Sequence, residues 1–276
     1  MSAPQRNAKI LTAIRWVFLS SVLVFVLFPL FWLGLASLKT RAAALKVPPE
    51  IIFVPSIEAY EKIFSSGLAN AFFNSFSIAI TNVVLSLGIG VPAAYALARM
   101  RGALQENISF WILSIRLAPL FSIILPLYVM FQQMGLLDTR IAVAMAHLTL
   151  TLPLSVWLLM TYFRAVPVDL DEAAMLDGAK PWQTLIMVIL PIARPMIASV
   201  AVIVFIFSWN EFMLAFFLTS RDSQTVPVIV AGLAGTMSFD WPLIAAISIC
   251  SMVPALVFVG FAQKHIVEGL ASGAVK

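Results

Sequence analysis

The sequence predicts an all-α membrane protein with six transmembrane helices, and two observations support this. First, 62% of the 276 residues are hydrophobic and 11% are charged, which is more apolar surface than a water-soluble domain can bury. Second, six low-charge runs each exceed the ~20 residues that cross a ~30 Å hydrocarbon core. Helices follow because backbone groups in lipid must bond within their own segment, whereas barrel strands would be shorter and would alternate. The runs are 16–38, 72–97, 108–131, 141–163, 196–218 and 241–262.

An even number of spans places both termini on one side of the membrane, and the basic residues indicate that this side is cytoplasmic. With the amino terminus inside, the inner segments carry more Lys and Arg than the outer ones, in moderate agreement with the positive-inside rule. The inner set is Arg6, Lys9, Arg15, Arg99, Arg101, Arg164, Lys180, Arg194, Lys264 and Lys276, and the outer set is Lys39, Arg41, Lys46, Lys62, Arg140 and Arg221. The first run is too long for a signal-peptide core and has no small-x-small cleavage site, so we expect it to be retained.

The residue types that carry catalysis or metal binding are few and scattered. Cys250 is the single cysteine and lies inside the last run, which excludes an intramolecular disulfide and a cysteine-based metal cage. His147 and His265 lie on different segments without a paired carboxylate, so packing or a surface position is the favoured interpretation of each. No Ser-His-Asp order, phosphate-binding glycine loop or metal motif occurs. We therefore expect a non-catalytic chain that binds no cofactor or metal. The sequence also has no basic cluster of the kind that binds nucleic acid.

Three features mark the remaining organisation of a single membrane domain over residues 1–276. Ser56 is a candidate N-cap for a short surface helix in the loop 39–71. The segment 223–235 is apolar but too short to span, which predicts a re-entrant or interfacial element. Prolines inside the spans predict kinks, and kinked helices suit a bundle that moves. They are Pro92, Pro119, Pro126 and Pro153.

The loop 164–195 is unusually polar for so apolar a chain, with four acidic residues in nine positions: Asp169, Asp171, Glu172 and Asp177. Asp169 followed by Glu172 predicts a capping box at the start of a short helix. Gly178 stands where a left-handed terminating residue is wanted, and Pro181 suits the first turn of a second short helix. The sequence therefore predicts a helix–turn–helix on the cytoplasmic side.

The first of these helices has a small apolar surface, formed by Ala173, Ala174, Met175 and Leu176. Two interpretations fit this surface. It could pack against its own bundle, or it could insert into a groove on a peripheral protein that pushes on the flanking spans. The physical chemistry of the loop leaves both open.

The loop contains a pattern of fixed spacing: Glu-Ala-Ala, three residues, Gly, nine residues, an aliphatic residue, one residue, and Leu-Pro. In this chain it is Glu172-Ala173-Ala174, Gly178, Val188 and Leu190-Pro191. This pattern resembles the signature loop of permease subunits of binding-protein-dependent ABC importers. The one departure is Val188, where isoleucine is usual, and the change is conservative.

The resemblance covers nearly the whole chain and narrows to the carbohydrate-uptake class, specifically the maltose-type second permease subunit. The matching features are Asn74-Ser75, AYALAR at 94–99, LPLY at 125–128, GLLDT at 135–139, SWNEF at 208–212 and the tail 269–276. It implies a type I ABC importer permease fold in a bacterial inner membrane. It also implies import of a sugar, polyol or related solute. An importer of an amino acid, polyamine or phosphate ester shares the loop and remains an alternative, as does, with less support, an ion-coupled secondary transporter.

The resemblance further implies partners and site residues. The partners are a second permease subunit, two cytoplasmic ATPase subunits that hold ATP and Mg²⁺, and an extracytoplasmic solute-binding protein. Contact with the ATPase is expected from Glu172, Ala173, Ala174, Met175, Leu176, Gly178, Leu190 and Pro191. The tail residues Gly269, Gly273 and Lys276 are candidates for a second contact with the ATPase.

Glu211 is the one acidic residue within a predicted span, and a charge near the bilayer centre costs ~2.5–3.5 kcal/mol. It should therefore face the bundle or a wet cavity. Trp209, Asn210 and Glu211 are candidates for the solute path, although hydrogen bonding between helices is the favoured interpretation. Arg116 differs from Glu211 by ~10 Å in depth, so pairing would need staggered or broken helices. We expect Arg116 to extend toward the inner surface and Glu211 to hold neighbouring polar groups.

Overall fold

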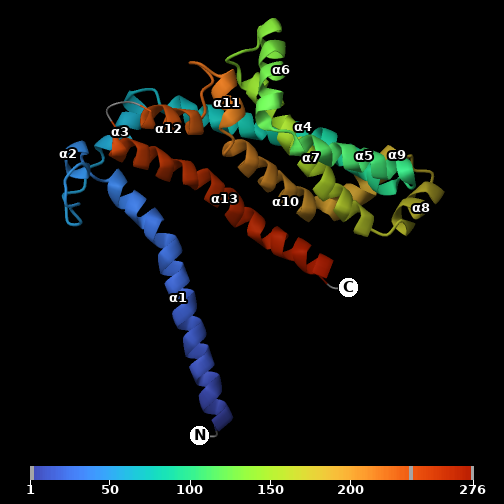
Figure 1. Cartoon of the computed structure of the whole chain (residues 1–276). Helices are drawn as coiled ribbons and strands as arrows, with labels where there is room; N and C mark the ends of the chain where they lie inside the picture. Colours follow the sequence, from blue (N-terminus) through green and yellow to red (C-terminus); the bar gives the residue numbers. More distant parts are fainter. Residues whose placement is uncertain (1–2, 236–238, 275–276) are drawn as a thin grey trace. The chain divides into compact units, whose positions relative to one another are not determined.

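The structure is a computed structural model that describes residues 3–235 and 239–274, with side chains described over 11–235 and 239–260. The described residues form helices and contain no strand (Figure 1). They divide into two compact units, Met1–Leu68 with Gly232–Cys250, and Ala69–Ala231 with Ser251–Lys276. The helices are α1 (Ala3–Ser37), α2 (Arg41–Ala44), α3 (Glu58–Ser65), α4 (Ala69–Arg99), α5 (Ala103–Ser114), η1 (Ile115–Leu117), α6 (Leu120–Gln133), α7 (Arg140–Ala165), α8 (Asp169–Leu176), α9 (Pro181–Thr184), η2 (Leu185–Ile189), α10 (Leu190–Trp209), α11 (Met213–Leu218), α12 (Val226–Ala234) and α13 (Trp241–Ala274).

Five segments of the described chain are long and apolar enough to cross a membrane: Leu11–Ser37, Ala69–Arg99, Arg140–Ala165, Pro181–Trp209 and Trp241–Gly260. In the first, within α1, none of the residues in the most apolar window is buried, whereas 56% of the corresponding window in α7 is buried. Helix α7 therefore lies inside the bundle of the second unit, whereas the first unit covers none of the residues in this window of α1.

The predicted third span, 108–131, is not one continuous helix. Helices α5–η1 and α6 meet at an angle of 91°, and the count of six spans holds only if this bent pair is one span. Ala118 and Pro119 are both extended at the break. Proline disfavours helical backbone at the residue before it and has no N–H to continue the ladder. The kink predicted at Pro119 is therefore confirmed in a stronger form, as a full break.

The predicted fifth span, 196–218, is displaced toward the amino terminus. The continuous segment runs from Pro181 to Trp209, and Met213–Leu218 is a separate helix. Part of the difference lies at Pro191, where a helix would be expected to break. Proline has no N–H to bond the carbonyl four residues earlier, and its ring collides with that carbonyl. The chain absorbs the disturbance in the π-helical turn η2, where the N–H of Leu190 bonds to the carbonyl of Leu185. The helix therefore continues through the proline instead of ending before it.

Helices α4, α7 and α10 run alongside one another and form the core of the second unit (Figure 1). Their shared cluster includes Ala94, Leu159, Phe163, Val200 and Val204, all buried. The closest approach uses small residues: a Cβ on Gly90 of α4 would lie 2.7 Å from Ser155 Oγ of α7. That hydroxyl also lies 3.1 Å from the hydroxyl of Ser86, inside the seam. Small residues that let backbones approach are the usual means of helix association in lipid.

Hydrogen bonds to Asp138 join the α6–α7 turn to the segment after α11. The Asp138 carboxylate accepts from the backbone N–H groups of Ser220, Arg221, Asp222 and Ser223 at 2.9–3.1 Å, and from the hydroxyls of Ser220 and Ser223. Partial burial opposes ionisation, but the N–H groups of Asp222, Ser220 and Arg221 outweigh it and hold the pKa of Asp138 well below its ordinary value. The carboxylate thus fixes a loop that has no regular structure of its own.

The first unit contains the short surface helix predicted between residues 39 and 71, which is α3. Its N-cap position is Ile57, so Ser56 is not the cap, although its Oγ accepts from the N–H of Glu58 at 3.3 Å. The hydroxyls of Tyr60 in α3 and Ser37 at the end of α1 lie 2.7 Å apart. The segment 223–235, predicted as re-entrant or interfacial, is mostly the helix α12. It begins in the second unit, and its residues from Gly232 onward belong to the first.

Replacing Gly90 with alanine should destabilise the protein by about 1–3 kcal/mol, because the new methyl group would collide with Ser155 Oγ in a packed seam. The thermal midpoint of the detergent-purified protein measures this. Gly88→Ala is the matched control, since no atom lies within 4 Å of a Cβ built there. Adding Ser155→Ala should recover part of the loss, and an unchanged midpoint in Gly90→Ala would contradict the packing.

Replacing Asp138 with asparagine should lower stability at pH 7 by roughly 1–2 kcal/mol, since an amide cannot accept from all of these donors. Because the folded-state pKa lies below that of the unfolded chain, the wild-type contribution is complete above about pH 4 and is lost as the pH falls further. The difference between variant and wild type should therefore shrink below about pH 4. Thermal unfolding at several pH values tests this, with Asp222→Asn, an exposed carboxylate in the same turn, as the control.

Candidate functional site

Helix α8 is the short helix predicted in the polar loop, but the predicted capping box is wrong. The helix begins at Asp169 itself, and Val168 occupies the cap position without a side-chain hydrogen bond. Asp169, Asp171 and Glu172 all lie in the first turn, where negative charge favours the positive end of the helix dipole. The charges thus stabilise this end without the reciprocal hydrogen bonds of a capping box.

The carboxyl end of α8 agrees with the sequence. Gly178 has φ +89°, the left-handed conformation that ends helices, and its N–H bonds to the carbonyl of Met175. Pro181 occupies the first turn of α9, as predicted. The second helix is not short, however, because α9, η2 and α10 continue as one segment to Trp209. The loop is therefore one short helix and a turn that leads directly into a span.

The predicted contact residues fall into three groups. Glu172, Ala173 and Leu176 of α8 are exposed, Leu176 to 90%, and Gly178 is exposed beside them in the turn. Met175 is half-exposed, and Ala174 is buried against the bundle. Leu190 and Pro191 belong to α10 and not to the α8 surface, although Pro191 is exposed. We call the four residues Glu172, Ala173, Leu176 and Gly178 the α8 surface.

A hollow of about 530 Å³ lies between α8, the end of α4 and the start of the α9 segment. Its lining is mostly apolar and includes Tyr95, Met175, Trp182 and Leu185. Apolar packing beneath this side of α8 is therefore incomplete. The sequence interpretation missed what lies at its edge: Asp171 is buried against Tyr95 and Arg99 of α4. In the sequence, only the charge of Asp171 indicated a buried ionic contact, because its partners Tyr95 and Arg99 are more than 70 residues away.

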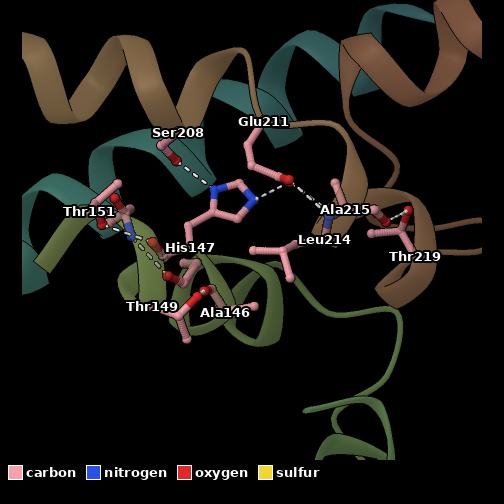
Figure 2. A network of polar contacts seen from close by, with 11 residues as sticks. Ala146, His147, Thr149, Thr151, Ser208, Glu211, Leu214, Ala215 and Thr219 are labelled. Carbon is pink, nitrogen blue, oxygen red and sulfur yellow. Dashed lines mark hydrogen bonds and ion pairs between the residues drawn. The ribbon is translucent and has the colours of Figure 1, made fainter. Parts of the chain in front are cut away.

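A second polar group lies where the fifth span ends (Figure 2). His147 of α7 contacts both Ser208, at 2.8 Å from Nδ1, and Glu211, at 3.2 Å from Nε2. The Glu211 carboxylate also accepts from the N–H groups of Leu214 and Ala215, the first turn of α11. The favoured interpretation of His147 as a packing residue is therefore only part of its role. The ring is buried, and it also forms a hydrogen bond with Ser208. Glu211 holds neighbouring polar groups, as predicted.

The three candidates for the solute path differ in accessibility. Trp209 is buried, and its Nε1–H donates to the carbonyl of Ser251. The Glu211 side chain is 8% exposed and already has partners. Asn210 is exposed, and its amide donates to the carbonyl of Ile206. Arg116, predicted to extend toward the inner surface, lies at the α5–α6 break with its guanidinium 5.7 Å from the ring of Phe207.

The tail is described only in part. The backbone of α13 continues as helix through Gly269 and Gly273 to Ala274, well beyond the end of the predicted sixth span. The side chains of this stretch and all of Lys276 lie outside the described residues.

Comparison with known proteins decides the family. A model of the binding-protein-dependent transport system inner membrane component matches residues 86–271. The chain belongs to this family. The predicted resemblance to ABC importer permeases is confirmed, and a multi-pass membrane protein follows from the same match.

Relatives similar over nearly the full length are known. The chain is 35% identical over 272 residues to the trehalose transport system permease protein SugB of Mycobacterium tuberculosis, covering 96% of this chain and 98% of the relative. It is 34% identical to the trehalose/maltose transport system permease protein MalG of Thermococcus litoralis, covering 92% of each chain.

A solved structure has the same fold. It is a bacterial ABC transporter involved in the import of the acidic polysaccharide alginate, with a TM-score of 0.77 and 23% identity over 96% of this chain and 98% of that chain. The predicted type I ABC importer permease fold is confirmed by this match.

In this permease, Glu211→Ala should lower stability by about 1–3 kcal/mol, since it leaves two N–H groups of α11 without their acceptor and removes the carboxylate beside His147 Nε2. Glu211→Gln keeps an amide oxygen and should lose less. Thermal unfolding measures both, with Asn210→Ala as the exposed control. Equal midpoints for Glu211→Ala and wild type would show that the network contributes nothing to stability.

Proposed function

We propose that this chain is the transmembrane permease subunit of an ATP-driven, binding-protein-dependent importer for a sugar, polyol or related solute. The observation that carries the proposal is the α8 surface: an exposed acidic and apolar face on a short helix held between two spans. An isolated leucine exposed to 90% on such a helix suits insertion into a groove on a partner. The solute class is supported by the relatives named for trehalose and maltose, and by a melibiose/raffinose/stachyose import permease of Bacillus subtilis that is 32% identical over 83% of this chain.

The complete importer on this proposal contains a second permease subunit, two cytoplasmic ATPase subunits and an extracytoplasmic solute-binding protein. This chain catalyses nothing itself; ATP and Mg²⁺ bind to the partner, which hydrolyses the ATP. The α8 surface and both termini then lie in the cytoplasm. A solved structure of similar fold, in complex with an alginate pentasaccharide-bound periplasmic protein, is consistent with such an assembly.

The α8 surface receives the ATPase in this arrangement. Leu176 would enter an apolar groove and Glu172 would pair with a cation at its rim. Ala174 packs α8 against the bundle, Leu190 and Pro191 shape the start of α10, and Met175 borders the contact. Residues Gly269, Gly273 and Lys276 would approach the ATPase dimer. When the ATPase subunits close on ATP, α8 moves and access to the solute path switches from outside to inside.

Asn210 is proposed to face the solute path, with Glu211 and Trp209 fixing the backbone around it from buried positions. A non-carbohydrate solute, such as an amino acid, polyamine or phosphate ester, is the alternative. An affinity screen of the associated binding protein separates these classes. An ion-coupled secondary transporter needs no ATPase, so co-purification of an ATPase with this chain would exclude it.

Glu172→Lys, and separately Gly178→Val, should abolish ATP-dependent uptake while the protein still inserts into the membrane. The first reverses the charge of the α8 surface, and the second forces a β-branched residue into a left-handed conformation with no nearby atom to clash with, so its effect is on the backbone. Uptake into proteoliposomes and membrane content by immunoblot measure the two outcomes. Normal solute accumulation by either variant would contradict the coupling role.

A further inference from the structure

We propose that Tyr95, Arg99 and Asp171 fasten α8 to α4, so that force applied to the α8 surface enters α4 directly as well as the spans that flank α8 in sequence. This inference rests on the proposed function, since it assumes that an ATPase moves α8. It assigns positioning roles to three residues that do not belong to the α8 surface.

The contacts join three elements at one point. Arg99 Nη2 lies 2.7 Å from Asp171 Oδ2, with the two side chains 16% and 5% exposed. These two atoms are held by opposite charge, since they are not aligned as a hydrogen bond. The Tyr95 hydroxyl donates to the other carboxylate oxygen, Oδ1. Arg99 Nη1 donates to the carbonyls of Phe163 and Val166 at the end of α7, at 2.9 and 3.3 Å. We call Tyr95, Arg99 and Asp171 the α4–α8 clamp.

The clamp is the buried ionic attachment of α8, beside the apolar contact that partly buried Leu170 makes with the bundle core. Only two of its eight residues are buried, Asp171 and Ala174, and the hollow of about 530 Å³ lies along its inner side. Ala174 and Leu170 supply apolar contacts, whereas Asp171 supplies the charged contact that joins α8 to α4. A buried ion pair that loses one partner leaves an uncompensated charge, which is why such a contact resists separation when the helix is pushed.

The geometry of the clamp favours both charges. Tyr95 and Arg99 are four residues apart and therefore lie on one face of α4. Arg99 is the last residue of α4, where the helix dipole favours a cation, and Asp171 is in the first turn of α8, where it favours an anion. The two helix ends thus meet through charges that each end already stabilises.

Through the clamp, α8 reaches the opposite end of the second unit. Helix α4 has 31 residues, about 46 Å at 1.5 Å per residue. At its other end, the Asn74 amide donates to the carbonyls of Asp222 and Gln224, and the Ser75 hydroxyl accepts from the N–H of Val226. Helix α4 therefore has polar side-chain attachments at both ends, to α8 and to the segment 222–226. Among the described residues, neither of the two spans that flank α8 in sequence has polar side-chain attachments to both of these segments.

The test measures solute transported per ATP hydrolysed in proteoliposomes that contain the whole importer and its binding protein. Asp171→Asn and Arg99→Gln should lower this ratio by roughly 2- to 30-fold, while the ATPase still co-purifies and hydrolyses ATP. Tyr95→Phe, which removes one donor, should lower it less, and Arg99→Lys should keep part of it. The reversed pair Arg99→Asp with Asp171→Arg should recover part of what either reversal loses alone. Arg101→Gln, an exposed cation at the same end of α4, is the control and should leave the ratio unchanged.

The outcomes are distinguishable. If the wild-type protein retains no ATPase and shows no ATP-dependent uptake, the proposed function fails and the clamp has no force to carry. If the wild type couples and Asp171→Asn, Arg99→Gln and Tyr95→Phe all keep the wild-type ratio, the clamp is overturned while the function stands. Loss of ATPase binding and uptake in equal proportion would also overturn it, because α8 would then affect docking alone. Should Asp171→Asn fail to insert, the ratio in Tyr95→Phe and Arg99→Lys decides.

Discussion

A backbone in lipid has no water to satisfy its hydrogen bonds, and three irregularities in the spans of this protein show how the chain meets this constraint. At Pro191 the ladder widens into the π-turn η2, so the N–H of Leu190 still finds a carbonyl. At the end of α10 the Glu211 carboxylate accepts from the first turn of α11. At the break before α6, Pro119 stands where an N–H would have no helical partner. Pro119, Pro191 and Glu211 thus answer the same requirement, that backbone groups in the spans keep a hydrogen-bonding partner.

Polar side chains also determine how the second unit is tied together at its ends. The core between α4, α7 and α10 is apolar and close-packed, and it holds the helices side by side. At one end Asp138 and Asn74 fix the segment 218–226, and at the other Arg99 joins α4 to α7 and α8. Apolar packing gives the bundle its cohesion, whereas these charged and amide groups determine which loops are attached to which helix.

The sequence predicted the features that depend on local composition. Apolar runs located the spans, and Gly178 and Pro181 located the end of α8 and the start of α9. It failed where a break or contact depends on distant residues. Hydropathy continues from residue 196 to 218, so nothing in composition shows that the helix ends at Trp209; the break is stabilised by Glu211 and by His147, 64 positions earlier. The attachment of Asp171 to Arg99 was hidden for the same reason, and the predicted capping box failed because the helix begins one residue earlier than the box requires.

The contrast between α1 and α7 has a consequence for biosynthesis. Because no residue in the most apolar window of α1 is buried, this helix needs no other part of the chain before it can enter the bilayer. Helix α7 is different, since α4 is made before it but α10, which carries the partner of His147, is made after it, so this buried polar face is incompletely covered at first. During translation, α1 can therefore leave the insertion machinery at once, whereas α7 is expected to remain there until α10 has been made.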